Sequence, residues 1–221
     1  MVLNRGDKRV VVVRSLESPD MPIVGSMGDD IIRPNYLYWA NNERLLVALS
    51  VPAKAHRVRE HKLKREDFDI NDYFMYSRMV GFDVDLANSA LLLEDEGGLR
   101  YNRSLSRITN FLPNDKDHVL MTAVRNNRLQ QFKVNVNNGQ SELVVRGGIR
   151  TVRILNDEDG APRFRLDYLP RSKAIQVYEY QDDDHWRKVD KIYLDDDDED
   201  SIDIEGLIAL YKNSLVYRKR N

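Results

Sequence analysis

Apolar and polar residues alternate with a period of two over several short stretches of the chain. Residues 82–86 read Phe-Asp-Val-Asp-Leu, and this period is typical of a strand with one buried face. The alternation returns fifty positions later at residues 132–136, Phe-Lys-Val-Asn-Val. A polar link and a second apolar stretch follow each copy, at residues 91–93 and 143–145. Both copies are therefore predicted to be hairpins, the second with Asn138-Gly139 at its turn, a pair typical of the type I′ geometry.

A second offset, of 43 residues, aligns three successive strand-like segments. The matched positions are Ile108 with Thr151, Met121 with Phe164, and Phe132 with Ile175. The segments that open at Trp39 and Phe111 also share an aromatic residue, a polar turn and an apolar strand. Repeats of about 40–50 residues with four strands each are typical of propeller blades. We predict that Trp39, Phe82, Phe111 and Phe132 pack between such blades.

The predicted fold class is all-β: a partial β-propeller of about four blade-like, four-stranded antiparallel sheets within a single region, residues 1–221. We expect the first hairpin, residues 8–25, to have no strand before it, and the last strand to lie at residues 214–217. A closed propeller has about four to eight blades, so we interpret the chain as an excerpt of a longer protein or a marginally closed propeller. Whether the parent continues past Asn221 stays open. Exposed strand edges favour pairing with another chain, so homo-oligomers through blade edges are expected.

Residues 53–71 depart from the strand pattern and are interpreted as a basic insertion within one blade. Four of its side chains are candidate contacts for a substrate or a partner, and a purely solvated surface is the alternative. They are Arg57, Arg59, Lys62 and Arg65. The acidic run at residues 195–200 lacks the ligand spacing and the turn glycine of an EF-hand calcium loop, and is predicted to be a solvated loop because like charges repel.

Composition excludes several classes of protein. The 34 Lys and Arg residues nearly balance 36 Asp and Glu residues, whereas a nucleic-acid-binding domain normally carries a basic excess. Cysteine is absent, which excludes disulfides and thiolate chemistry. The apolar stretches are far shorter than the roughly 20 residues of a membrane helix. We see no signal peptide in this chain, and a cytoplasmic or periplasmic location stays open.

Catalytic motifs are not found in the sequence. The nucleophile elbow of serine hydrolases, G-x-S-x-G, does not occur, and the histidines fit no metal-binding spacing. The four histidines are His56, His61, His118 and His185. We therefore expect no catalytic, cofactor-binding or metal-binding residue here, and loop or turn positions for the histidines.

Residues 110–121, Asn-Phe-Leu-Pro-Asn-Asp-Lys-Asp-His-Val-Leu-Met, resemble a recurring blade strand in the N-terminal propellers of bacterial prolyl oligopeptidase-like serine peptidases. Residues 132–144 and 37–47 also resemble these blades. The resemblance implies a non-catalytic propeller that gates or selects peptide substrates for a separate C-terminal α/β-hydrolase domain, which carries a Ser-Asp-His triad. That domain and peptides would be the partners. The alternative is a free-standing propeller that binds a protein partner.

Overall fold

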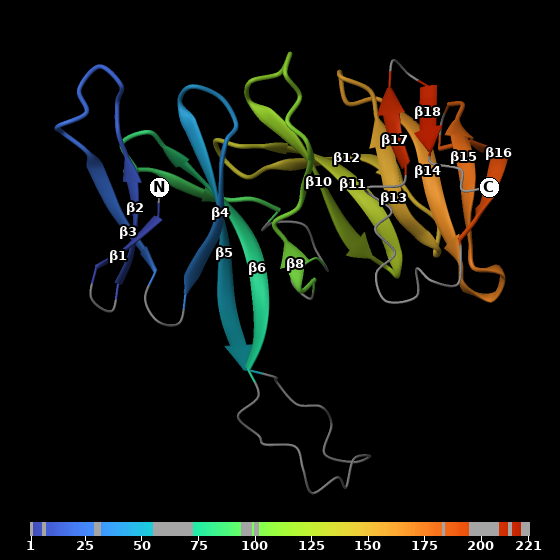
Figure 1. Cartoon of the computed structure of the whole chain (residues 1–221), viewed down its shortest axis with the longest axis horizontal. Helices are drawn as coiled ribbons and strands as arrows, with labels where there is room; N and C mark the ends of the chain where they lie inside the picture. Colours follow the sequence, from blue (N-terminus) through green and yellow to red (C-terminus); the bar gives the residue numbers. More distant parts are fainter. Residues whose placement is uncertain are drawn as a thin grey trace, which may run out of the picture. The chain divides into compact units, whose positions relative to one another are not determined.

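The computed structural model of this chain consists of short antiparallel sheets, divided between two compact units (Figure 1). Unit 1 comprises residues 1–107 and 135–140, and unit 2 comprises residues 108–134 and 141–221. The structure describes residues 2–5, 8–28, 32–54, 73–93, 99, 102–182, 184–194, 208–211 and 214–217. Within these ranges, none of the helical segments has the length and apolar character needed to cross a membrane.

Unit 1 begins with a three-stranded antiparallel sheet in the order β1-β2-β3. Its strands are β1 (Val2–Arg5), β2 (Lys8–Val13) and β3 (Ile23–Gly28). The prediction that no strand precedes residue 8 is wrong, because β1 pairs with β2 and places Val2 opposite Val11. A strand of four residues is too short for its alternation to be read from sequence, and the pairing partner supplies its hydrogen bonds.

The second sheet of unit 1 has the path β4-β5-β6-β7, and β8 pairs in parallel with β6. These strands are β4 (Arg33–Trp39), β5 (Arg44–Lys54), β6 (Tyr73–Asp83), β7 (Ser89–Leu91) and β8 (Ser104–Leu105). Apolar residues of β5, Leu45 and Val47, form a buried cluster with Val11 of the first sheet. The two sheets of unit 1 therefore share one apolar core.

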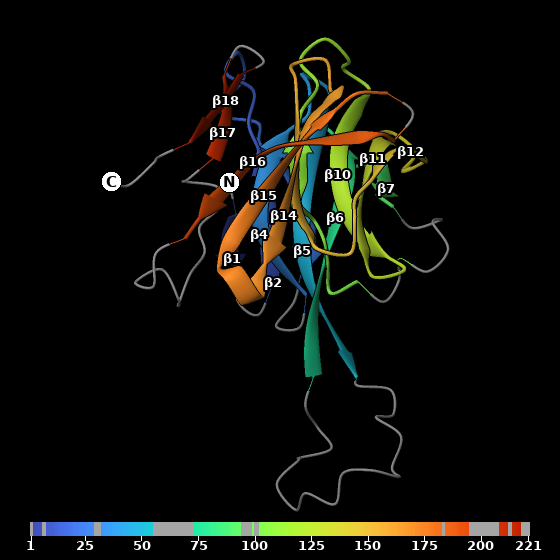
Figure 2. The ribbon, with the colours of Figure 1, turned by 90° about the vertical axis from the view of Figure 1, so that its right-hand side faces the viewer.

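Unit 2 contains two four-stranded sheets of the same up-and-down order, followed by a two-stranded hairpin (Figure 2). The first sheet contains β9 (Ile108–Asn110), β10 (His118–Arg125), β11 (Arg128–Asn135) and β12 (Ser141–Arg146). The second contains β13 (Thr151–Asn156), β14 (Pro162–Leu169), β15 (Ala174–Tyr180) and β16 (Trp186–Tyr193). The hairpin is β17 (Ile208–Tyr211) with β18 (Ser214–Tyr217). The 43-residue offset is confirmed, because it maps β9, β10 and β11 onto β13, β14 and β15.

The fold class is therefore all-β, with three sheets that each run through four strands in sequence order, as in propeller blades. In unit 2, Leu166, Ile175 and Val177 are completely buried in one cluster. Phe132 of β11 is also completely buried. In each of the middle strands β10 and β11, three successive residues are buried. Because successive side chains of a strand point to opposite faces, both faces of this sheet are covered there.

Two of the four repeated aromatic residues do not fit the predicted packing. Phe132 is buried and Phe82 packs against the unit 1 core, but Trp39 is 52% exposed and Phe111 is 38% exposed. Trp39 is the last residue of β4 and Phe111 follows the last residue of β9. An aromatic residue at a strand end faces a turn, where no neighbouring strand covers it, so the prediction is wrong for these two.

The hairpin predicted at Asn138-Gly139 is confirmed, since this pair lies between β11 and β12. The predicted type I′ geometry is wrong for this turn, because Gly139 has a φ of 77° but Asn138 has no positive φ. The two consecutive positive φ values that a type I′ turn requires occur at Asn126 and Asn127, between β10 and β11. Asparagine tolerates this conformation better than most other residues.

Candidate functional site

The site residues predicted from sequence lie in a segment that the structure does not describe. Arg57, Arg59, Lys62 and Arg65 fall in residues 55–72, between the end of β5 and the start of β6, outside the described residues. The acidic run at residues 195–200, His56 and His61 are also outside them.

Of the two described histidines, His185 lies in the loop before β16, as predicted, whereas the prediction is wrong for His118, which is the first residue of β10. His118 Nδ1 lies 2.9 Å from Asp115 Oδ1, and His185 is exposed at a turn closed by the Gln181 N–H. The Asp115 carboxylate also lies 2.6 Å from Lys133 Nζ. Among the described residues no group of three His, Asp or Glu side chains could hold a metal ion.

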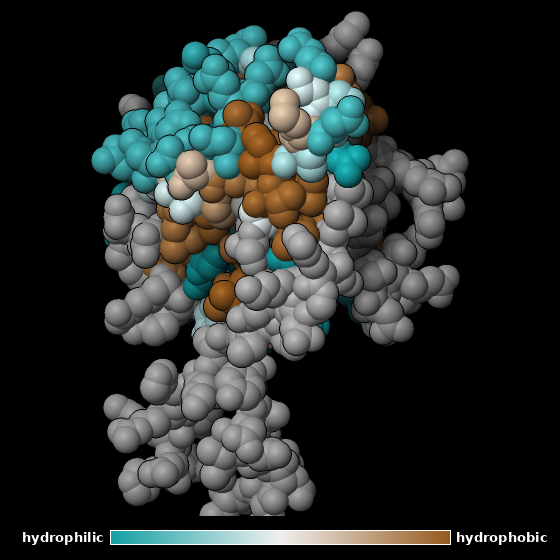
Figure 3. All heavy atoms as spheres, turned by 90° about the vertical axis from the view of Figure 1, so that its left-hand side faces the viewer, coloured by the Kyte–Doolittle hydropathy of each residue, from teal (hydrophilic) through white to brown (hydrophobic). Residues whose placement is uncertain are grey.

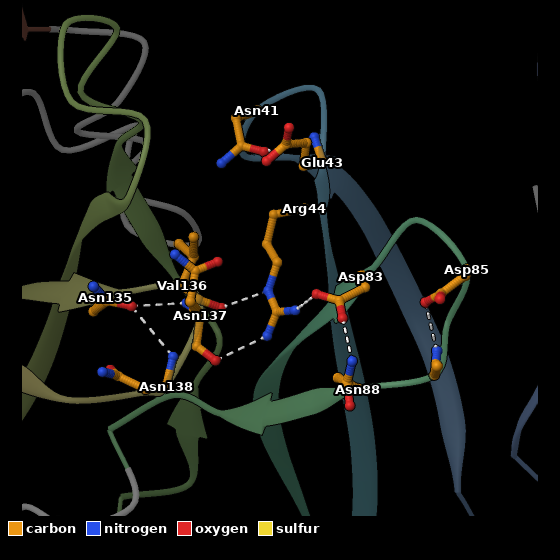
Figure 4. Close-up of polar contacts among 11 residues, drawn as sticks. Asn41, Glu43, Arg44, Asp83, Asp85, Asn88, Asn135, Val136, Asn137 and Asn138 are labelled. Carbon is orange, nitrogen blue, oxygen red and sulfur yellow. Dashed lines mark hydrogen bonds and ion pairs between the residues drawn. The ribbon is translucent and has the colours of Figure 1, made fainter.

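Arg44 lies at the centre of a buried polar network in unit 1 (Figure 4). The residue begins β5, where a polar turn ends, and only 3% of it is exposed. Its Nε donates to the Val136 carbonyl over 2.8 Å, and its Nη2 donates to the Asn137 carbonyl over 3.1 Å. Its Nη1 forms an ion pair with the Asp83 carboxylate at the end of β6.

All three guanidinium nitrogens of Arg44 bind groups of the protein itself. Asp83 Oδ2 also accepts a hydrogen bond from Asn88 Nδ2 over 2.6 Å, so both carboxylate oxygens have partners. A Cβ atom at Gly81 would lie 2.5 Å from the Val136 carbonyl oxygen, so a glycine is needed for this close approach. We therefore assign Arg44 a structural role, in which it holds residues 135–140 against the β5–β6 strand pair.

A buried carboxylate in unit 2 anchors a second polar arrangement. Asp167 of β14 is 7% exposed, and its Oδ1 accepts a hydrogen bond from the Thr151 hydroxyl over 2.7 Å. The same hydroxyl oxygen accepts from the Gly148 N–H over 2.7 Å. Arg165 approaches both carboxylate oxygens, with Nε 3.1 Å from Oδ1 and Nη2 3.2 Å from Oδ2. The Arg165–Asp167 pair is therefore fixed to the loop that precedes β13.

Two aromatic rings hold the Arg165 guanidinium in place. Its central carbon lies 4.3 Å from the centre of the Tyr178 ring and 5.1 Å from the centre of the Trp186 ring. Cation–π contacts of this kind favour a fixed orientation of the planar guanidinium. The Trp186 Nε1–H is buried and has no hydrogen-bond partner. These side chains form the floor of an open hollow of about 570 Å³, which we call the arginine pocket.

Three further arginines line the arginine pocket: Arg128, Arg146 and Arg150. Each is exposed, and none has a side-chain hydrogen bond or ion pair with another described residue. Two carboxylates line the same hollow. The Asp167 carboxylate forms an ion pair with Arg165, and Asp184 is exposed. The pocket therefore presents excess positive charge, and its chemistry suits an anionic group.

Sequence reasoning missed both Arg44 and the arginine pocket. The pocket arginines come from the ends of β11 and β12, the loop at residues 147–150 and strand β14, so no local run of charge marks them. The Gly147-Gly148 pair before β13 was the available signal, because adjacent glycines often mark a close approach of the backbone to other groups.

No family model matches this chain, and no curated protein matches it. Among solved structures, the chain is similar to a dipeptidyl peptidase 4 from Porphyromonas gingivalis, with 10% identity and a TM-score of 0.47. The match covers 86% of this chain and 30% of that chain, so the chain spans less than a third of the peptidase. It is also similar to a putative 6-phosphogluconolactonase from Bacteroides uniformis ATCC 8492, with 12% identity, a TM-score of 0.37, and 88% and 70% of the two chains covered. At these values neither likeness assigns an activity.

Proposed function

We propose that this chain is the non-catalytic propeller part of a prolyl oligopeptidase-like serine peptidase, and that it gates or selects peptide substrates for a hydrolase domain outside this chain. One observation carries the proposal. The segments whose sequences resemble the blades of this family, residues 110–121 and 132–144, contribute to all four strands of one sheet, β9 to β12. The sequence contains no G-x-S-x-G elbow, so the nucleophile would come from the additional domain.

A covalent probe of serine hydrolases tests the presence of that domain. Antibodies raised against this chain would capture the natural protein from the cells that make it, and a fluorophosphonate would then label any activated serine. We expect a labelled species clearly larger than the 25.8 kDa of this chain. An unlabelled protein of about that mass would contradict the proposal and favour the free-standing binding module.

The gating role has a separate test in the captured or full-length enzyme. A propeller that admits only small substrates predicts rapid hydrolysis of short peptide reporters and negligible hydrolysis of an unfolded protein of several hundred residues. Weakening the core of unit 2 by Phe132→Leu should raise the relative rate on the long substrate, since the sheet then opens more often. Equal rates on both substrates in the unaltered enzyme would contradict the gating role.

We also propose that copies of this chain associate through sheet edges. The first sheet of unit 1 ends at β3, where Ile23 and Val24 are 38% and 50% exposed, and apolar side chains gather on this side of the molecule (Figure 3). An edge strand with apolar side chains favours pairing with another strand. Sedimentation velocity at increasing concentration should show a dimer or larger species that Val24→Lys disperses. A monomer at every concentration would refute this association.

A further inference from the structure

A second, apolar hollow of about 540 Å³ adjoins the arginine pocket in unit 2. Its lining includes Val152, Tyr168 and Pro170, and Val152 is 37% exposed. Ile149, Arg150 and Leu169 line both hollows. Ile149 is 74% exposed, so a large apolar side chain stands in solvent at the boundary between the two. Apolar surface and convergent polar donors side by side are the usual composition of a ligand site.

The charges of the arginine pocket indicate what it would hold. Arg146 and Arg150 flank the Gly147-Gly148 turn, and neither pairs with a carboxylate of the described residues. Arginines that share a hollow repel one another unless an anion lies between them. Guanidinium groups bind carboxylates through paired, charge-assisted hydrogen bonds. Because the Tyr178 and Trp186 rings and the Asp167 carboxylate already fix Arg165, the floor of the pocket is preorganised for such a ligand.

We propose that these two hollows form one binding site for a peptide segment in which a carboxylate lies next to an apolar side chain. The carboxylate would lie among Arg146, Arg150 and Arg128, and the apolar side chain would pack against Ile149 and Leu169. The carboxylate can belong to a peptide C-terminus or to an Asp or Glu side chain. The inference uses unit 2 alone and holds whether or not a hydrolase domain follows the chain.

The position of the tryptophans allows a direct binding assay. The sequence has two tryptophans, Trp39 and Trp186, so Trp39→Phe leaves only the one in the arginine pocket. Three probes would be titrated into the full chain: acetyl-Ala-Ala-Leu as the free acid, the same peptide as its amide, and acetyl-Ala-Glu-Leu-Ala amide. We expect a saturable change in Trp186 emission with the free acid, with the glutamate peptide, or with both. Added salt should weaken the binding of each peptide that causes this change. The probe that binds more tightly identifies the source of the carboxylate.

Substitutions at the rim test the residues. Arg146→Gln with Arg150→Gln should weaken binding about tenfold, as expected when charge-assisted hydrogen bonds are lost. Lys188→Gln, in strand β16 of the same sheet but outside the pocket, is the control for loss of a positive charge and should leave the affinity within about twofold. Ile149→Ser should weaken binding of the leucine peptide and leave the affinity for acetyl-Ala-Ala-Gly unchanged. All these side chains are exposed, so circular dichroism and thermal midpoints should stay close to those of the parent.

Several results would overturn the proposal. One is equal affinity for the acid and amide peptides together with no binding of the glutamate peptide. The others are an unchanged affinity in the double arginine variant and an unchanged affinity of Ile149→Ser for the leucine peptide. The absence of binding to every probe at about 10 mM would also overturn it. Failure of this site would leave fluorophosphonate labelling unchanged, so it is distinguishable from failure of the peptidase proposal.

Discussion

Replacing Arg44 by methionine tests whether the buried guanidinium holds residues 135–140 to the β5–β6 pair. Methionine has similar length and no donors, so the Val136 carbonyl loses its hydrogen bond in a fully buried position. An unsatisfied buried acceptor costs about 1–3 kcal/mol. The Asn137 carbonyl and the Asp83 carboxylate lose less, because Asn137 is exposed and the Asp83 side chain is 36% exposed, within reach of water. We expect Arg44→Met to lower the free energy of unfolding by about 3 kcal/mol.

The assay uses the distribution of tryptophans between the units. Trp39 lies in unit 1 and Trp186 in unit 2, so Trp186→Phe leaves Trp39 as the reporter of unit 1. Urea unfolding of this background with and without Arg44→Met gives the difference in free energy. In a protein of this size about 3 kcal/mol corresponds to a fall in the melting temperature of roughly 6–12 °C.

The control is Arg14→Met, an exposed arginine of the same unit, which should change stability by no more than about 0.5 kcal/mol. A double-mutant cycle with Asp83→Asn isolates the ion pair, and residues in direct contact show coupling of about 0.5–3 kcal/mol. A loss below about 1 kcal/mol for Arg44→Met, close to that of the control, would refute the assignment of Arg44 as a structural clamp.

Three further substitutions have defined outcomes. Phe132→Ala should lower the free energy of unfolding of unit 2 by about 3–5 kcal/mol, because the ring is completely buried. The fluorescence of Trp186 in a Trp39→Phe background reports this unfolding, and a near-neutral result would refute the repeat alignment. Gly160→Ala should cost at least about 1 kcal/mol, because Gly160 has a φ of 87° and a Cβ there would lie 2.5 Å from a leucine side chain. Gly148→Ala, whose Cβ would meet nothing closer than 3.5 Å, is the control. If both substitutions lowered the melting temperature equally, the strain assigned to an alanine at position 160 would be contradicted. Hydrogen bonds from Lys133 and from the neighbouring histidine hold the pKa of Asp115 at about 2. A carboxylate with a depressed pKa stabilises the folded state at pH values above its unfolded pKa of about 3.9, and this stabilisation is lost as the pH falls toward 2. The melting temperature of Asp115→Asn should therefore be lower than that of the parent at pH 7 and close to it at pH 2. A gap that persisted at pH 2 would contradict this reasoning.

Repetition in the sequence predicted most of the fold. The alternation at Phe132 and Ile175 marks β11 and β15, which are the third strands of their sheets, but of residues 82–86 only Phe82 and Asp83 lie in β6, and a turn follows them. Where the alternation lies within a strand it identifies the buried face, and the equal spacing between copies identifies equivalent strands. The prediction was wrong where the signal was short or local. Strand β1 has four residues, and Trp39 is apolar but lies at a strand end beside a turn.

The candidate site could not be predicted in the same way. Arg44 bonds to residues more than 90 positions away in the sequence, and no local pattern distinguishes it from other arginines that begin strands. The basic insertion attracted attention because its charges are consecutive, whereas the arginine pocket collects its charges from separate strands and a turn.

The sequence by itself determined the periodicity, and with it most of the strands and the all-β class, because alternation depends on residues close together along a strand. The tertiary structure decided which polar side chains are buried and which charges lack a partner. Burial of Arg44 and Asp167, and the accumulation of arginines around Trp186, depend on pairing between strands that are distant in sequence. The energy of a charge is set by the groups that surround it in space, and only the folded chain brings those groups together.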